Sequence, residues 1–190
     1  MKNNFPMDDL VGVQEKIELK FLESHTHFLT GDIDDESIKK AIQWIIYENM
    51  SPPKEKRLTM YVNSCGGDLY QAFGLIDVMK KSQYPISTIG IGSIMSAGFL
   101  IFASGTKGYR QIAENTGIMC HQFSNEQEGK YHDIKAQIKE NDSCNQRMLN
   151  ILRDASGLPE RTIKAKLLGP TDAWLTAEEL VELKIADRIF

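Results

Sequence analysis

Hydrophobic residues recur along the chain at two spacings, and these predict strands and helices in alternation. The predicted strands are residues 27–31, 57–64, 86–93 and 117–122. The predicted helices are residues 34–49, 68–81 and a segment that begins after Ser96, while residues 51–56 form a predicted loop. Segment 34–49 illustrates the helical spacing with Ile38, Ala41, Ile42, Ile45 and Ile46. Strands that alternate with helices favour right-handed βαβ units, so we expect an α/β fold with a largely parallel sheet.

One segment breaks this alternation. Residues 131–155 carry a single long helical pattern that is polar over much of its surface. It is too long and too polar for an ordinary helix that covers a sheet, so we expect it to project from the body or to pack against another subunit. Residues 156–168 and 176–190 close the chain, and the second segment begins with Thr176 as an N-cap and Glu179 at the spacing of a capping box.

Composition narrows the class of protein. The chain has 190 residues, no repeat and no Gly/Ser-rich linker, so we expect one domain over residues 1–190. A net charge of −4 without a dense basic patch argues against a nucleic-acid partner. No apolar run approaches the roughly 20 residues that span a bilayer, and the first ten residues lack the apolar core of a secretion signal. We therefore expect a cytoplasmic protein, or one from an organelle or a virus, with no membrane partner.

Cysteine and histidine usage gives little sign of metal or cofactor chemistry. Cys65, Cys120 and Cys144 are few, odd in number and without CxxC spacing, as expected of reduced thiols rather than a disulfide framework or a zinc site. His25 and His27 alternate as on one face of a strand, but no carboxylate or cysteine lies at ligand spacing beside them. We expect no metal and no cofactor.

Four places in the chain carry residues suited to catalysis, and each also has a purely structural interpretation. Ser96 opens a helix, where it is either a simple cap or a nucleophile beside free N–H groups. The stretch NSCGGD (63–68) is either a tight turn or a source of amides for an anion. His121 ends an apolar strand, where it is either a general base or a buried core residue. Asp172 is either the third catalytic group or an aspartate that bonds its own turn. Spacing in the sequence does not show whether these four sites lie close together in the folded chain.

Several segments together resemble one family in order and spacing, from about Phe28 to Ile189: YVNSCGGD, IGSIMSAGFLIFASGTKGYR, GIMCHQ and LGPTDAWLTAEELVELKIAD. That family is ClpP, the proteolytic subunit of the Clp protease. The resemblance implies a crotonase-like fold of repeated ββα units with a projecting handle helix, and residues 131–155 fit that handle. Residues 1–26 match poorly.

Residue roles follow from this resemblance. It implies an active serine endopeptidase that cuts unfolded polypeptides inside an oligomeric chamber, with Ser96 as nucleophile, His121 as general base and acid, and Asp172 orienting the imidazole. Gly67 and Ala97 would supply the oxyanion-hole amides. The substrate-binding strand would include Gln122, Phe123 and Ser124.

The resemblance also implies partners, and here the chain departs from the family pattern. We expect a homo-oligomer of heptameric rings stacked in pairs, fed by a Clp-type ATPase. The ATPase-docking surface would include Tyr61 and Ile89, but Thr59, Gln111 and Ala113 are atypically polar or small there. Cys65 and Phe123 stand where the family usually has proline, and Pro170–Thr171 replace a charged pair that links the two rings in many members.

Two alternatives stay open at this stage. The first is a ring subunit that is non-catalytic or depends on a partner. The second is a crotonase-type enzyme that acts on a CoA thioester, which would need a catalytic carboxylate in place of Ser96 and His121.

Overall fold

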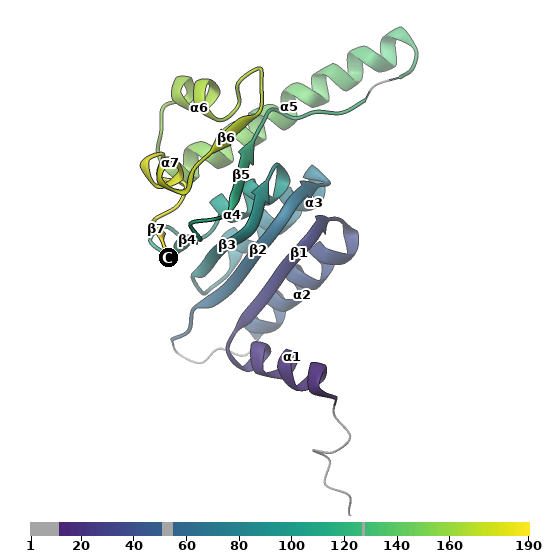
Figure 1. Cartoon of the computed structure of the whole chain (residues 1–190). Coiled ribbons are helices and arrows are strands. Elements are labelled where there is room, and N and C mark those ends of the chain that lie inside the picture. The colour runs from purple at the N-terminus through teal and green to yellow at the C-terminus, as the bar shows by residue number, and fades with distance from the viewer. Residues whose placement is uncertain (1–11, 51–54, 127) are drawn as a thin grey trace, which may run out of the picture.

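A computed structural model describes residues 12–50, 55–126 and 128–190 of the chain. Its strands form one mixed sheet (Figure 1): β1 (Thr26–Ile33), β2 (Leu58–Gly67), β3 (Ile86–Met95), β4 (Arg110–Ile112), β5 (Gly117–Cys120), β6 (Ala173–Leu175) and β7 (Arg188–Ile189). The helices in this part of the chain are α1 (Val13–Glu23), α2 (Asp35–Met50), α3 (Leu69–Lys81), α4 (Ala97–Ala103), α5 (Tyr131–Ser156), α6 (Glu160–Lys166) and α7 (Ala177–Glu182).

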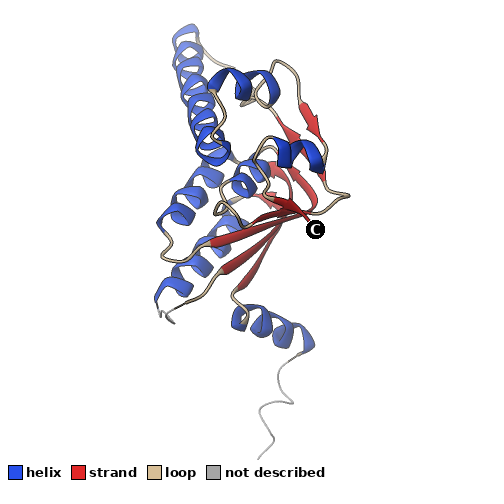
Figure 2. Cartoon of the chain, turned by 90° about the vertical axis from the view of Figure 1, so that its left-hand side faces the viewer, coloured by secondary structure: helices blue, strands red, loops and turns tan. Residues whose placement is uncertain are grey.

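The sheet confirms the expected α/β class. Parallel pairing runs through β1, β2, β3, β4 and β7 in that order. The later part of β3 also pairs in parallel with β5, and β5 pairs with β6 in the only antiparallel ladder among the described strands. α2 and α3 lie on the same side of β1, β2 and β3 (Figure 2), while α1 packs against β1 through Phe21 and Phe28.

α4 lies at the centre of the molecule, because all seven of its residues are buried. It packs against β2, β3, α3 and α5. Its approach to β2 is close: a Cβ atom at Gly98 would lie 3.0 Å from the carbonyl oxygen of Ser64. The apolar run that follows Ser96 is therefore the core helix of the fold, and it holds the residue before it firmly in place.

The long polar helix is α5, which extends one residue beyond the predicted end and projects away from the sheet (Figure 1). Its buried residues all lie between Cys144 and Ser156, while the part nearer Lys130 has none. Gly157 ends the helix in the left-handed conformation at φ 72°, and its N–H donates to the carbonyl of Arg153. Within the described residues, the outer half of this helix therefore buries no side chain fully.

Other boundaries differ from the predictions for physical reasons. The strand predicted at 117–122 ends at Cys120, because β3 stops pairing at Met95 and β6 at Ala173. α1 was not predicted, although Val13, Ile17 and Phe21 lie at helical spacing; none of its side chains is fully buried. The loop predicted at 51–56 lies mostly outside the described residues. No helix in the described part of the chain has both the length and the apolar character needed to cross a membrane.

Candidate active site

Ser96 occupies the sharp junction between β3 and α4. Its backbone has φ 53° and ψ −121°, a conformation that glycine adopts readily and other residues rarely. The Ser96 side chain makes no capping hydrogen bond to α4. The capping interpretation of this serine is therefore wrong, and its backbone is held in a strained turn.

That hydroxyl faces His121. Nε2 of His121 lies 2.8 Å from Oγ of Ser96. Two strand contacts set this distance: Met95 pairs with Met119, and the Ser96 N–H donates to the Met119 carbonyl at 3.0 Å. Both side chains thus lie just past the carboxyl ends of neighbouring parallel strands, where α/β sheets place their ligands. The pair has the hydrogen-bond geometry that a serine nucleophile and its base require.

The glycine turn after β2 lies directly beside the Ser96 junction. Gly66 has φ +110°, and a Cβ atom there would lie 2.7 Å from Cβ of Ser96 and 3.2 Å from the nitrogen of Ala97. Gly67 has φ +144°, and a Cβ atom at this position would collide with the backbone of Ile33. Ala97 is the first residue of α4, where an N–H has no partner within the helix. The amides of Gly67 and Ala97 thus come from two segments in close contact beside the serine.

Asp172 is the one predicted triad residue that does not contact the Ser96–His121 pair through a hydrogen bond in the described part of the chain. Its side chain is exposed, and within the described part of the chain no hydrogen bond joins it to His121. The strand register nevertheless relates the two residues. Cys120 pairs with Ala173 in the antiparallel ladder, so one further pair would place His121 directly opposite Asp172.

A comparison with known families gives a match to the Clp protease family over residues 13–190. The chain belongs to the Clp protease family. The match begins well before Phe28, where the sequence resemblance was expected to start, so all of α1 lies within the matched region as well.

The residues predicted to bind substrate follow His121 in the Clp protease fold. Gln122 donates from Nε2 to the carbonyl of Leu168 at 3.0 Å. The ring of Phe123 packs against the core, and its backbone N–H donates to Oδ1 of Asn145 at 2.9 Å. Ser124 is exposed. Asn145 was not predicted to have a role, and the only signal in the sequence is a polar residue on a buried turn of the long helix.

Other reactive side chains near the site do not compete with Ser96. Burial raises the pKa of the Cys120 thiol to about 12, so this neighbour of His121 stays protonated and unreactive near neutral pH. Cys65 is exposed, and its Sγ lies 3.5 Å from Oγ of Ser93. Serine is therefore the nucleophile that this site supports best.

The two histidines near the start of β1 have separate structural partners. Nδ1 of His25 lies 2.9 Å from Oε2 of Glu48, an oxygen that also pairs with Nζ of Lys56. The ring of His27 stacks on Trp44, and burial, with a smaller effect of Lys40, lowers its pKa to about 4. Among the described residues, no group of three His, Cys, Asp or Glu side chains could hold a metal ion.

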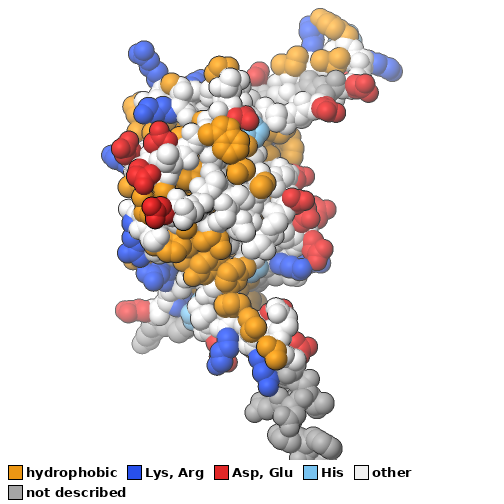
Figure 3. All heavy atoms as spheres, in the orientation of Figure 1, with side chains coloured by type: hydrophobic (Ala, Val, Ile, Leu, Met, Phe, Trp, Pro, Cys, Tyr) orange, Lys and Arg blue, Asp and Glu red, His pale blue; other side chains and the backbone are white. Residues whose placement is uncertain are grey.

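The residues predicted for ATPase docking lie in neighbouring strands. Tyr61 pairs with Ile89, and Ile89 pairs with Gln111, so these three side chains form one row across β2, β3 and β4. Phe28 extends the row on β1 and stacks on Tyr61 with ring centroids 4.7 Å apart. The row lies on a face where hydrophobic side chains gather (Figure 3).

Proposed function

We propose that this chain is the proteolytic subunit of a Clp-type protease, and that it hydrolyses unfolded polypeptides with a Ser96–His121–Asp172 triad. The observation that carries the proposal is the 2.8 Å contact between Ser96 Oγ and His121 Nε2, made by a serine that does not cap its helix. Membership of the Clp protease family supports protease chemistry independently of that contact.

In the proposed reaction Oγ of Ser96 attacks the carbonyl carbon of a peptide bond while Nε2 of His121 takes the hydroxyl proton. The carbonyl oxygen becomes an oxyanion, and the N–H groups of Gly67 and Ala97 donate to it. His121 then returns the proton to the leaving amine, which departs and leaves an acyl-enzyme. A water molecule, deprotonated by His121, releases the second product and restores Ser96.

Substrate recognition would use the extended segment at Gln122, Phe123 and Ser124. A polypeptide that pairs with such a segment is read through its backbone, which gives loose sequence specificity. The active site of a protease with such loose specificity needs to be sequestered from folded proteins. Membership of the Clp protease family in general implies a ring oligomer and a Clp ATPase partner. We propose heptameric rings stacked in pairs, with α5 at the contact between rings. The three unpaired cysteines favour a reducing compartment such as the cytoplasm.

A second candidate function rests on Asp172. Because this carboxylate is exposed and makes no hydrogen bond with His121, the single chain has a nucleophile and a base but lacks the third group. We infer that the alternative to a self-sufficient protease is a ring subunit whose triad is completed only in an assembly with a partner.

The test combines an active-site label, peptide turnover and native mass spectrometry. The wild type is expected to react with a fluorophosphonate probe and to cleave a short fluorogenic peptide, while Ser96→Ala does neither. Ser104→Ala is the matched control, because Ser104 lies at the other end of α4 and donates only to Leu100 within the helix. Labelling without turnover in intact rings would favour the partner-dependent subunit. Absence of labelling in intact rings would overturn the peptidase proposal.

A further inference from the structure

The extended segment after His121 lies along α5, and two asparagines of α5 hold it there. Oδ1 of Asn145 accepts from the backbone N–H of Phe123 at 2.9 Å. The side chains of Asn141 and Asn125 exchange two hydrogen bonds, each 3.3 Å long. None of the described residues 122–126 belongs to a strand or helix, so these contacts replace the ladder that ends at Cys120.

The spacing of the two contacts matches the spacing of the two elements. Asn141 and Asn145 are four residues apart, which is about 6 Å along an α-helix. Phe123 and Asn125 are two residues apart, which is about 6.6 Å along an extended chain. The partners run in opposite directions, because the later helix residue holds the earlier segment residue. One turn of helix therefore fits one repeat of extended backbone.

This arrangement determines which edge of the segment is available. In an extended chain, successive N–H groups point to opposite edges. Since the Phe123 N–H is directed at α5, the N–H of Ser124 is directed away from it, toward the open side of the segment. Ser124 is exposed, whereas the Phe123 ring is anchored against the core. A polypeptide that adds to this edge meets a backbone whose orientation is already set.

We propose that Asn145, assisted by Asn141, is a positioning residue that holds the substrate-pairing edge at Ser124 in register with Ser96. The proposal rests on the proposed peptidase function. It applies to chains with a residue other than proline at position 123, because proline has no N–H for Asn145 to accept.

The first test separates binding of an extended peptide from reactivity of the serine. Asn145→Ala is expected to raise KM for a fluorogenic peptide by about fivefold to tenfold, the effect of one lost hydrogen bond, with kcat changed less than about twofold. Asn145→Asp keeps the acceptor oxygen and should restore KM. The labelling rate with a small fluorophosphonate should stay unchanged, because that probe does not use the edge. Gln146→Ala is the matched control, since Gln146 donates only to Asn150 on its own helix.

The second test does not depend on activity. In Ser96→Ala protein, adding Asn145→Ala should speed amide hydrogen exchange of Phe123 by at least about tenfold. In a Phe123→Pro background, Asn145→Ala should change KM less than about twofold, because the donor is already gone. Unchanged exchange at Phe123, or an equal loss of fluorophosphonate labelling and peptide turnover, would overturn the positioning role. A wild type that is never labelled would instead refute the peptidase proposal, while the exchange result would still decide the role of Asn145.

Discussion

Replacing Gly66 by alanine places a methyl group against the proposed nucleophile. The new Cβ atom would lie 2.7 Å from Cβ of Ser96, about 0.7 Å inside an ordinary contact of 3.4 Å. The φ of +110° at Gly66 adds a backbone strain of about 1–2 kcal/mol for any residue with a side chain. Because α4 behind Ser96 is fully buried, relief of the contact should displace Ser96 or the turn at Gly66 and so disturb the contact between Ser96 and His121. A displacement of this size costs about 100-fold in catalytic rate.

Gly108→Ala is the matched control for this change. Gly108 has a similar left-handed φ of +88°, but a Cβ atom there meets nothing within 4 Å. Urea unfolding should therefore show a loss of about 1–2 kcal/mol in both variants, with a further 1–3 kcal/mol in Gly66→Ala from the close contact. Fluorophosphonate labelling of Ser96 should fall about 100-fold only in Gly66→Ala. Equal labelling of the two variants would refute the claim that Gly66 is needed for the position of Ser96.

Three further predictions follow from the same structure. Between pH 6.5 and 4, His27 is protonated in the unfolded chain but not in the folded chain, so the free energy of unfolding should decrease by about 3 kcal/mol as the pH falls across this window. Urea midpoints measure this decrease. His27→Phe keeps a ring against Trp44 and should remove most of the pH dependence. Asp187→Ala should cost about 3–5 kcal/mol in urea unfolding, because it leaves the buried guanidinium of Arg110 without its carboxylate. Asp172→Asn should lower kcat in assembled rings by at least about 100-fold, yet leave fluorophosphonate labelling of the isolated chain unchanged; a loss of labelling in the isolated chain would contradict the unpaired state of Asp172.

The sequence predicted those parts of the fold that bury apolar side chains in a regular pattern. The run after Ser96 is apolar at every position from Gly98 to Ala103, and this alone placed a core helix directly behind the serine. The same logic located His121 at the end of a strand. β7 is two residues long, so it leaves no period that a pattern could reveal. α1 does have apolar residues at helical spacing, Val13, Ile17 and Phe21, but it buries no side chain in the core.

The hydrophobic pattern could not predict contacts between residues that are far apart in the sequence. The hydrogen bond from Phe123 to Asn145 joins positions 22 residues apart, and it depends on where α5 passes the segment. The positive φ of Ser96 and the close approach of Gly66 to it arise in the folded chain, and spacing in the sequence does not reveal them. Residue type and order therefore predicted which residues form the site, whereas tertiary packing decided how they are oriented.

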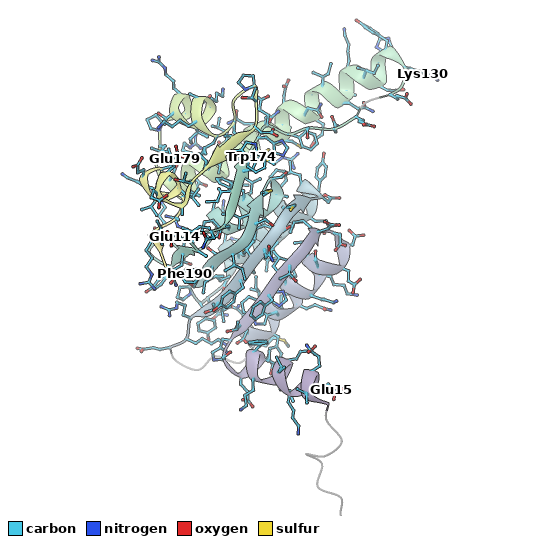
Figure 4. The ribbon with its side chains drawn as sticks, viewed as in Figure 1. Glu15, Glu114, Lys130, Trp174, Glu179 and Phe190 are labelled. Carbon is cyan, nitrogen blue, oxygen red and sulfur yellow. The ribbon has the colours of Figure 1, made fainter. Side chains whose placement is uncertain are left out.

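The three triad positions differ in how firmly the chain holds them, and this difference bears on how activity is controlled. Ser96 and His121 follow β3 and β5, which pair with each other within the sheet. Asp172 precedes β6, a strand of three residues with β5 as its one neighbour in the sheet. Trp174 on β6 is 63% exposed, and Lys130 marks the outer end of α5, whose first half buries no side chain (Figure 4). The proposed triad therefore requires the β5–β6 ladder to extend by one pair, so that Asp172 lies opposite His121.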